Sequence, residues 1–476
     1  MIDKTVQEAA AMAGGVLAGA ADPSVRIAGV SIDSRTVQPG NLFVPIPGER
    51  FDGHDFVLDS WRAGAKAVLW QADHGSPPEG LPAIVVKDTL AALQQLAAAY
   101  RRERSAQIIA VTGSNGKTTT KDMIAAVLSR SYKVHKTAGN YNNHLGLPLT
   151  LLQMPEDAEF AVLEMGMSGR GEIASLSNIA RPDAAVITNI GEAHLMQLGS
   201  REAIAAAKLE ILTGLREDGV LFYNGDEPLL ERALQAIENG SYPEGLRMPA
   251  GLVRFGASPH NDVYPTAVLM DEDGTRFTVN GLPDEPMRIP LWGRHNVVNA
   301  AIAIAVARRF QVDWADIREG LANLKPTVMR AEIIRTPDGV TVLNETYNAS
   351  PTAMRAALEL LAELHGFRRK IAVIGDMLEL GDQEEEFHSR IGRDIDPKDI
   401  DWVLTYGRLA SFAGKEAGKR FPTGHVLMFQ EKEAVVRELC RLASDGDVIL
   451  VKGSRGMRME DIVRGFLEAR GVRQSG

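Results

Sequence analysis

The chain has 476 residues, of which 45% are hydrophobic and 24% charged, and its formal net charge is −10 at pH 7. This length corresponds to roughly two to four globular domains, and the acidic balance argues against a broad nucleic-acid-binding or membrane-binding face. The single cysteine, Cys440, excludes an intramolecular disulfide and a thiolate metal cluster.

The N-terminus and the hydropathy pattern favour the cytoplasm. Residues 1–5, Met-Ile-Asp-Lys-Thr, lack the basic segment and apolar core of a signal peptide. No apolar run approaches the ~20 residues that span a bilayer. We therefore expect a cytoplasmic protein that does not insert into a membrane.

Short β-rich runs characterise the first block of the chain. The predicted strands are residues 27–32, 42–46, 67–69 and 83–86. A helix follows, with Asp88 as its N-cap and an Ala/Leu/Gln-rich body that extends to Tyr100. The polar residues 101–105 are interpreted as a connector, which places a first domain at residues 1–103.

Strands and helices alternate in the second block. Its first strand, residues 108–111, leads into a glycine-rich turn, and a helix is predicted at residues 201–212. The further predicted strands are residues 160–163, 184–187 and 220–223. This alternation is typical of a parallel sheet covered by helices. Residues 263–289 instead carry Asp-Glu-Asp-Gly and Asn-Gly turn signals and are predicted to form antiparallel hairpins.

The third block begins near Lys325-Pro326 and alternates again, ending in a predicted helix at residues 459–468. Its predicted strands are residues 341–343, 371–374, 402–405 and 448–451. We predict an α/β protein of three domains: a small α/β N-terminal domain, a central phosphate-binding domain at residues 104–325 with a mostly parallel sheet, and a Rossmann-like domain at residues 326–476.

The turn after the strand at 108–111 has the composition of a phosphate-binding loop. It contains the consecutive residues Gly113, Ser114, Asn115, Gly116, Lys117, Thr118 and Thr119. Glycines let backbone N–H groups face phosphate oxygens, the lysine supplies positive charge, and the first threonine hydroxyl stands where Mg²⁺ would bind. Val111 occupies the position of the first glycine of the full Walker pattern, so the match is to a shortened variant. The alternative is a strand–turn–helix link with an exposed lysine.

Three further side chains could surround a metal ion at the same edge of the sheet. Glu164 ends one predicted strand and His194 follows the next, and ligands gather at the carboxyl edge of open sheets. Lys208 lies on an apolar helix, where a depressed pKa would make its amine reactive toward CO₂ and give a carbamate. The simpler alternatives are a surface glutamate, a structural histidine and a lysine that extends to solvent, and the sequence alone does not favour the carbamate.

These motifs, in this order and spacing, resemble the Mur ligase family from end to end. The shared sequences are Gly113-Ser-Asn-Gly-Lys-Thr-Thr, Gly139-Asn-Tyr-Asn-Asn-His-Leu-Gly-Leu-Pro, Glu164-Met-Gly, Asn189-Ile-Gly-Glu-Ala-His-Leu, Ala207-Lys-Leu-Glu and Gly293-Arg-His-Asn-Val-Val-Asn. The resemblance implies a central P-loop ATPase domain in which residues 113–119 bind ATP phosphates. Thr118, Glu164 and His194 would coordinate two Mg²⁺ ions, with Lys208 as a carbamate ligand.

The same resemblance implies roles for residues outside the turn. Asn299 and Asn143 match residues that hold adenine, and Arg330 matches an arginine that reaches the phosphates from the third domain. Glu345 would contact the ATP ribose. Here the family's two aspartates and serine before the tyrosine are replaced by Asn344-Glu345-Thr346, which leaves the effect on this contact open.

Sequences at the two ends of the chain resemble the branch of the family that adds D-alanyl-D-alanine. Residues 30–44, with Ser34 and Arg35, and the sequence Phe51-Asp-Gly-His-Asp-Phe resemble the UDP-sugar domain shared by the last two ligases of the pathway. In the third block, the resemblance to this branch is carried by Tyr347-Asn-Ala-Ser-Pro, Ile374-Gly-Asp-Met-Leu-Glu-Leu-Gly and Val451-Lys-Gly-Ser-Arg-Gly-Met-Arg-Met-Glu. The amine substrate would meet Tyr347, Asn348, Lys452, Ser454 and Arg455. The alternative for the first two is a turn before a helix, and for the others a solvated strand end.

The resemblance implies ATP-dependent ligation of D-alanyl-D-alanine to UDP-N-acetylmuramoyl-tripeptide through an acyl phosphate, which supplies pentapeptide for peptidoglycan synthesis. We expect a monomer whose third domain closes over the central one. The first alternative is a tripeptide synthetase or folylpolyglutamate-type synthetase of the same fold. The second is a nucleotide-binding regulatory module that binds ATP without amine-dependent phosphate release.

Overall fold

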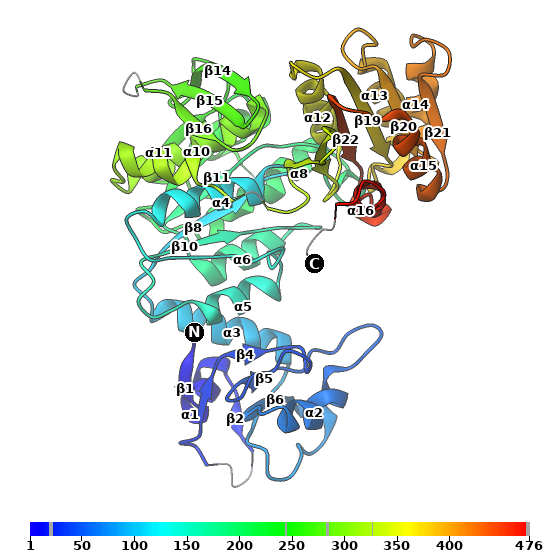
Figure 1. Cartoon of the computed structure of the whole chain (residues 1–476). Coiled ribbons are helices and arrows are strands. Elements are labelled where there is room, and N and C mark those ends of the chain that lie inside the picture. The colour runs from blue at the N-terminus through cyan, green and yellow to red at the C-terminus, as the bar shows by residue number, and fades with distance from the viewer. Residues whose placement is uncertain (19–21, 243–244, 282–284, 326, 473–476) are drawn as a thin grey trace.

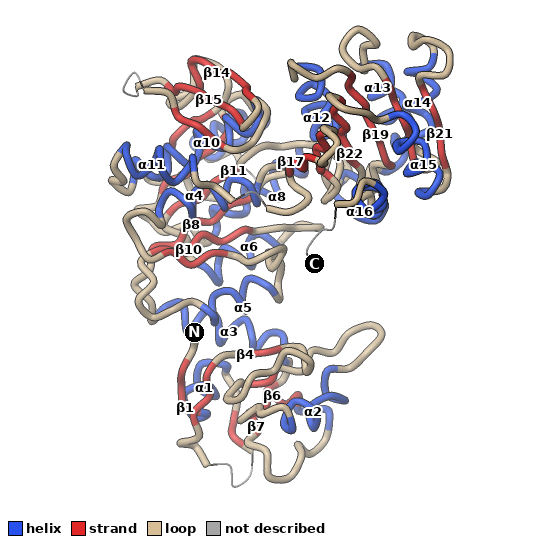
Figure 2. Tube along the Cα trace, in the orientation of Figure 1, coloured by secondary structure: helices blue, strands red, loops and turns tan. Residues whose placement is uncertain are grey.

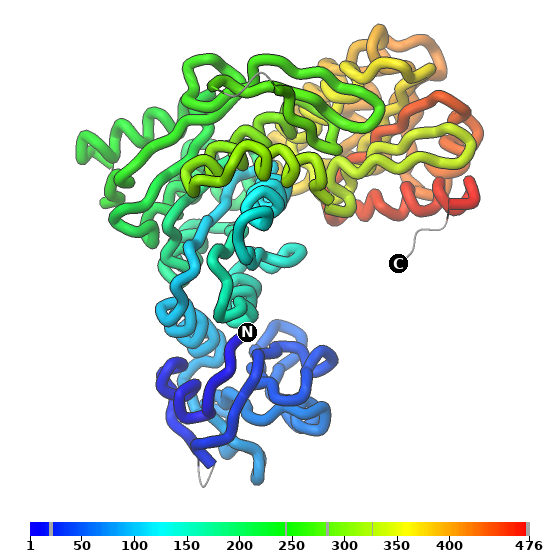
Figure 3. Tube along the Cα trace, turned by 60° about the vertical axis from the view of Figure 1, so that its left-hand side comes forward, coloured from blue at the N-terminus to red at the C-terminus, as the bar shows by residue number. Residues whose placement is uncertain are grey.

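The computed structural model describes all residues except 19–21, 243–244, 282–284, 326 and 473–476. The chain is α/β, as predicted, and forms an N-terminal unit (residues 3–102), a central unit (107–322) and a C-terminal unit (332–469). Figures 1 and 3 place the N-terminal and C-terminal units at opposite ends of the central unit. Pro326, where the third block was expected to begin, lies outside the described residues.

The N-terminal unit contains a five-stranded sheet of order β2-β7-β6-β5-β4 and a small antiparallel pair, β1-β3. Its strands are β1 (Asp3–Thr5), β2 (Val16–Leu17), β3 (Arg26–Ala28), β4 (Val30–Ser31), β5 (Leu42–Phe43), β6 (Ala67–Gln71) and β7 (Ala83–Val86), and its helices α1 (Val6–Ala13), α2 (Val57–Arg62) and α3 (Thr89–Arg102).

Two strand predictions in this unit were too long. The run at 27–32 is divided between β3 and β4, because Gly29 adopts a positive φ of 80° and the two halves join different sheets. The run at 42–46 stops at Phe43, since Pro45 lacks the N–H group that a ladder needs.

Helix α3 begins at the predicted cap, where the Asp88 side chain accepts a hydrogen bond from the Ala91 N–H. The predicted connector at 101–105 is wrong at its start, because the helix continues through Arg102. Arg101 is buried and its Nε donates to the Ala180 carbonyl at 2.9 Å. Its charge therefore joins α3 to the central unit and does not face solvent.

The central unit is built on a parallel six-stranded sheet of order β13-β12-β11-β8-β10-β9. Its strands are β8 (Gln107–Thr112), β9 (Val134–Lys136), β10 (Phe160–Glu164), β11 (Ala184–Ile187), β12 (Val220–Asn224) and β13 (Gly251–Phe255). Its helices are α4 (Lys117–Leu128), α5 (Gly146–Gln153), α6 (Glu172–Ala180), α7 (Leu195–Leu198), α8 (Arg201–Leu209), α9 (Pro228–Glu238), α10 (Arg294–Arg309) and α11 (Trp314–Ala322).

Both faces of this sheet are buried, which explains the continuous apolar runs of its strands. In β8, Ile108 and Ala110 join the core that includes α5 and α6, whereas Ile109 and Val111 join the core that includes α4 and α10. Figure 2 shows these helices on the two sides of the strands.

The hairpin prediction for 263–289 is confirmed for the described residues by an antiparallel sheet of β14 (Pro265–Asp271), β15 (Gly274–Val279) and β16 (Met287–Ile289). The single helix predicted at 201–212 is instead α8 followed by a 3-10 turn, η3 (Glu210–Thr213).

The C-terminal unit has a six-stranded sheet of order β17-β18-β22-β19-β20-β21, parallel except for the edge strand β17. Its strands are β17 (Glu332–Arg335), β18 (Thr341–Glu345), β19 (Arg369–Gly375), β20 (Trp402–Tyr406), β21 (Val426–Phe429) and β22 (Asp447–Lys452). Its helices are α12 (Pro351–Glu363), α13 (Glu384–Asp394), α14 (Ala410–Gly418), α15 (Lys432–Leu442) and α16 (Glu460–Ala469). Sequence reasoning missed β17 and β21, which lie at the two edges.

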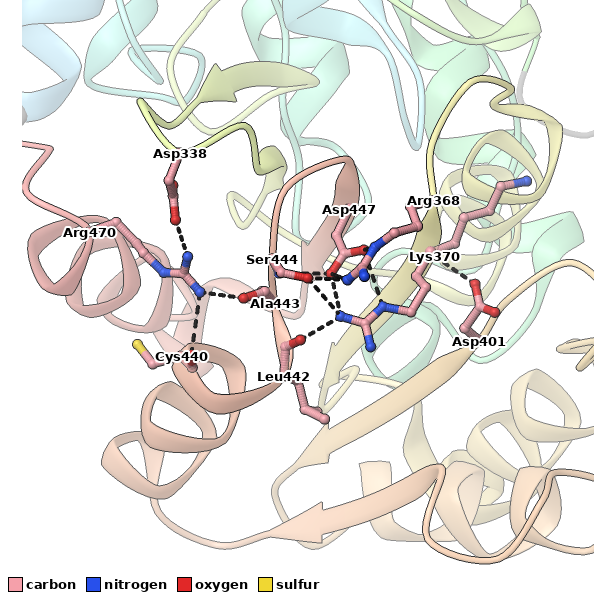
Figure 4. A network of polar contacts seen from close by, with 11 residues as sticks. Asp338, Arg368, Lys370, Asp401, Cys440, Leu442, Ala443, Ser444, Asp447 and Arg470 are labelled. Atoms are coloured by element: carbon pink, nitrogen blue, oxygen red, sulfur yellow. Dashed lines mark hydrogen bonds and ion pairs between the residues drawn. The ribbon is translucent and has the colours of Figure 1, made fainter.

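A polar network fixes the start of β22 (Figure 4). The fully buried Asp447 carboxylate accepts hydrogen bonds from Arg368 Nε at 3.2 Å and Arg369 Nη2 at 2.7 Å. Burial would raise the pKa of Asp447, but the hydrogen bonds from Arg369, Arg368 and the Ser444 N–H lower it overall. The carboxylate is therefore charged and paired.

Within the described residues, no helix combines the length and apolar character needed to cross a membrane.

Candidate active site

The glycine-rich turn joins β8 to α4 at the carboxyl edge of the central sheet. Gly113 has φ 147°, and a Cβ there would lie 1.8 Å from the Thr188 hydroxyl oxygen. Gly116 has φ 77° and immediately precedes the helix. Both positions thus require glycine, one for space and one for its backbone conformation, and the turn directs the N-terminus of α4 at the space above the sheet.

Lys117 is the first residue of α4, and its ammonium folds back onto the turn. Nζ donates to the Gly113 carbonyl at 2.8 Å and to the Ser114 carbonyl at 3.3 Å. Burial lowers the pKa of Lys117, the charge of Glu164 opposes that effect, and the charge of Arg330 adds to it. The Lys117 ammonium thus lies against the turn, within electrostatic reach of Arg330 from beyond the central unit.

Thr118 and Glu164 form a buried pair of hard oxygen donors. The Thr118 hydroxyl donates to Glu164 Oε2 at 2.7 Å, and Asn142 Nδ2 donates to Oε1 at 2.8 Å. Glu164 is 1% exposed, and it comes here because β10 pairs in parallel with β8. Carboxylate and hydroxyl oxygens are the donors that Mg²⁺ prefers, so this pair fits the metal that the turn implies.

His194 follows β11 at the same edge, in a left-handed conformation with φ 65°. Burial lowers the pKa of His194, the nearby Glu379 opposes that effect, and the charges of Lys117 and Lys208 lower it further. A neutral imidazole can act as a metal ligand. Its Nδ1 lies 3.0 Å from Glu379 Oε2 of the C-terminal unit.

Lys208 is 2% exposed near the end of α8. Burial lowers the pKa of Lys208 well below its usual value, and the charge of Lys117 adds to the effect. Among the described residues, none forms a hydrogen bond or ion pair with its amine. The structure therefore holds an amine whose charged form is disfavoured, within electrostatic reach of Lys117 and His194, so the sequence-predicted cluster converges on one edge.

A pocket of about 400 Å³ lies between the central and C-terminal units beside the turn. Its predicted members include Ser114, Asn115, Gly116, Lys117, Thr119, Asn299, Arg330, Glu345, Tyr347, Asn348 and Lys452. Asn115 Nδ2 is buried without a hydrogen-bond partner in the described part of the chain. An unsatisfied donor at the phosphate turn fits a phosphate oxygen.

Sequence reasoning missed several residues of this pocket, among them His295, Asn296, Asn224 and Asp226. The first two belong to the Gly293-Arg-His-Asn sequence, which could have signalled them. The other two lie at and just after the end of β12, where the carboxyl-edge rule applies without any distinctive motif.

The C-terminal side of the pocket is organised around Arg330 and Lys452. The Arg330 guanidinium lies 3.7 Å from the centre of the Tyr347 ring. Lys452 Nζ donates to Glu345 Oε2 at 2.8 Å and to the Asn348 carbonyl at 3.2 Å. Burial would raise the pKa of Glu345, but the charges of Lys452 and His295 lower it overall.

A second cavity of about 130 Å³ adjoins His194 and is lined by Asn348, Glu379, Ser454 and Arg455. The Ser454 hydroxyl donates to the Ala349 carbonyl at 3.2 Å and accepts from the Leu378 N–H at 2.8 Å. The Arg455 guanidinium is half exposed and pairs with Glu460 at 3.0 Å. The predicted amine-site residues therefore divide between two adjacent cavities.

Asn143, Ser34 and Arg35 line neither cavity and also lie apart from the cluster of Thr118, Glu164, His194 and Lys208. Asn143 lies shortly before α5, where its Oδ1 accepts from the Gly146 N–H at 2.9 Å, and the neighbouring Asn142 contacts Glu164. Ser34 and Arg35 lie in the N-terminal unit. Arg35 forms an exposed ion pair with Asp33 at 2.6 Å, which lowers the pKa of Asp33 to about 2 through hydrogen bonds from Arg35.

Three family models match the chain in succession. They are the Mur ligase family catalytic domain at residues 26–101, the Mur ligase middle domain at 111–307 and the Mur ligase glutamate ligase domain at 329–455.

Curated and solved relatives agree with these models. The UDP-N-acetylmuramoyl-tripeptide--D-alanyl-D-alanine ligase of Bacillus subtilis is 50% identical over 98% of this chain and 99% of its own length. The structure of MurF from Acinetobacter baumannii has a TM-score of 0.86 at 31% identity, covering 98% of this chain and 99% of that one. MurF ligase from Thermotoga maritima in complex with ADP has a TM-score of 0.80 at 30% identity, covering 93% and 98%. By sequence and by fold, the chain belongs to the Mur ligase family.

Proposed function

We propose that this chain ligates D-alanyl-D-alanine to UDP-N-acetylmuramoyl-tripeptide and converts ATP to ADP and phosphate. The observation that carries the proposal is the convergence of Lys117, Glu164, His194 and Lys208 at one edge of the central sheet. The 50% identity to a full-length ligase of that name supports the choice of substrates over those of a tripeptide or folylpolyglutamate synthetase.

Each unit takes one substrate in this proposal. Residues 1–103 bind the UDP-sugar, with Ser34 and Arg35 among the contacts, residues 104–325 bind ATP, and residues 326–476 bind the dipeptide. The protein acts as a monomer in the cytoplasm, and all three ligands are small molecules.

Activation of the carboxylate is the first chemical step. A carboxylate does not expel oxide, so an oxygen of the tripeptide carboxylate attacks the γ-phosphorus of ATP and releases ADP. Lys117 and Arg330 neutralise charge on the phosphoryl oxygens as it is transferred. When bound, two Mg²⁺ ions would neutralise the repulsion between the two anions, held by Thr118, Glu164, His194 and a carbamate on Lys208.

Attack by the dipeptide amine completes the reaction. The amine adds to the acyl carbon of the acyl phosphate, the tetrahedral intermediate expels phosphate, and an amide remains. Tyr347, Asn348, Lys452, Ser454 and Arg455 position the dipeptide beside this carbon. Since an acyl phosphate hydrolyses in water, the C-terminal unit has to close the site before the first step.

A phosphate-release assay across amines tests the proposal. With ATP and UDP-N-acetylmuramoyl-tripeptide, we expect release with D-alanyl-D-alanine and none with meso-diaminopimelate or glutamate, and release slowed about 10²–10³-fold in a Lys117→Ala control. Release with another amine would assign a different member of the family, and ATP binding without release under any amine would indicate a regulatory module.

A further inference from the structure

The loop after β11, residues 188–194, is tied to the phosphate turn. The Thr188 hydroxyl donates to the Asn115 carbonyl at 2.6 Å, and the Asn115 N–H donates to Asn189 Oδ1 at 2.9 Å. The Gly191 N–H donates to the Ser114 hydroxyl at 2.8 Å. These short links make the turn and the loop one rigid element.

Glu192 projects from this element onto the C-terminal unit. Its Oε2 accepts hydrogen bonds from the Thr352 hydroxyl at 2.6 Å and from the Thr352 N–H at 3.2 Å. Thr352 lies in the first turn of α12, whose cap residue Ser350 also donates to Asn115 Oδ1 at 3.3 Å. The N-terminus of α12 therefore rests directly on the phosphate turn and its attached loop.

The chemistry of this contact makes it specific for the docked arrangement. The first N–H groups of a helix lack partners within the helix and carry partial positive charge, which favours a carboxylate. Glu192 is 8% exposed, and a buried carboxylate is tolerated only when it is hydrogen-bonded. The only side-chain hydrogen bonds described for Glu192 come from Thr352, so both sides lose a partner if the units separate.

We propose that Glu192 is a positioning residue that seats the C-terminal unit on the phosphate turn. Glu192 does not line the nucleotide pocket, whereas Thr352, Arg330 and Tyr347 do. The contact therefore acts through α12, by holding the C-terminal wall of the pocket against the nucleotide. This role of Glu192 rests on the proposed ligase reaction only where kcat is measured, whereas docking of the C-terminal unit is measured without any substrate.

The test compares Glu192→Ala, Glu192→Gln and the isosteric Thr352→Val in the full chain. Small-angle X-ray scattering reports docking, equilibrium binding reports the Kd for a non-hydrolysable ATP analogue, and phosphate release reports kcat. A hydrogen bond to a charged group corresponds to a change of about 10- to 100-fold in the docking equilibrium. We expect Glu192→Ala to enlarge the radius of gyration, to lower kcat about tenfold or more and to raise the analogue Kd, because the C-terminal unit supplies one wall of the pocket.

The remaining variants keep the proposal falsifiable if the alanine variant folds poorly. Glutamine retains an acceptor oxygen, so the radius of gyration and the kcat of Glu192→Gln should lie between those of wild type and Glu192→Ala. Adding Thr352→Val to Glu192→Ala should change the docking equilibrium less than about twofold relative to Glu192→Ala alone, because the two residues form one contact. Two results would overturn the proposed role of Glu192: a radius of gyration that is unchanged in both Glu192 variants, or effects on docking that are fully additive in the double variant. If the radius of gyration changes in the Glu192 variants but none of the proteins, wild type included, releases phosphate, the docking role of Glu192 is supported and the proposed reaction is refuted.

Discussion

Replacing Lys208 with methionine should abolish ligation and at the same time stabilise the central unit. The lysine side chain is 2% exposed and its amine has no partner among the described residues. A polar group that is largely withdrawn from water without a hydrogen-bond partner costs about 1–3 kcal/mol, and methionine fills similar space without one. The free energy of unfolding should therefore rise by about 1–3 kcal/mol, and each 1 kcal/mol shifts Tm by about 2–4 °C for a unit of roughly 200 residues.

The pH dependence of this gain follows from the lowered pKa of Lys208. The folded chain binds the Lys208 proton more weakly than the unfolded chain does, so this lysine opposes folding more strongly as pH falls below 10.5 and not at all above it. The stability advantage of Lys208→Met should accordingly narrow as pH rises from 7 toward 10.5.

The assay is denaturant unfolding in CO₂-free buffer, paired with phosphate release. Lys121→Met is the matched control, because Lys121 is equally buried but donates to the Thr137 carbonyl at 2.8 Å and lies 3.3 Å from Asp122. That variant should lose stability. In Lys208→Ala, a short carboxylate should restore part of the activity. A destabilised or fully active Lys208→Met protein would refute the reasoning.

Three further predictions concern other charged groups. Lys117→Ala should lower kcat about 10²–10³-fold in phosphate-release assays, since it removes a cation from the transferred phosphoryl group; a change below tenfold would place that cation elsewhere. Asp447→Asn should destabilise the C-terminal unit by about 1.5–3 kcal/mol on denaturant unfolding, because it removes the charge that accepts hydrogen bonds from the partly exposed Arg368 and Arg369. Since the folded pKa of Asp447 is lowered, the wild-type advantage is present above the unfolded pKa of 3.8 and is lost as pH falls through the folded value. An unchanged stability at pH 7 would contradict this. Hydrogen bonds from His74 to Asp52 and Asp73 raise the pKa of His74, so its contribution to stability is present below pH 6.5 and is lost as pH rises through the folded pKa. His74→Gln should flatten the change in Tm across that pH range. The same dependence of Tm on pH in this variant and in wild type would count against the pairing of His74 with the two aspartates.

The sequence predicted that Glu164, His194 and the phosphate turn lie together because one rule of parallel sheets governs their positions. Glu164, His194 and the phosphate turn each follow a buried strand, and the carboxyl ends of parallel strands share one edge. Apolar runs locate such strands well, which is why β8, β10, β11 and β12 were predicted close to their observed bounds. The edge strands β17 and β21 were missed because partial exposure dilutes their apolar pattern.

Contacts between units were beyond the reach of sequence reasoning. Glu192, Glu379 and Arg101 look like ordinary surface charges, because nothing in their local sequence records the partner that buries or pairs them. Asn143 was assigned to adenine from a motif, and that contact stays a prediction; in the structure its Oδ1 accepts from the Gly146 N–H, while the adjacent Asn142 contacts Glu164. Adjacent asparagines in a loop cannot be distinguished without the backbone path.

In the proposed reaction, the tripeptide carboxylate accepts the γ-phosphoryl group at this edge of the sheet. The most direct test labels that carboxylate with ¹⁸O and follows the isotope by mass spectrometry during ligation to D-alanyl-D-alanine. Transfer through an acyl phosphate requires one ¹⁸O atom in each inorganic phosphate released. Unlabelled phosphate accompanying amide formation would contradict the account.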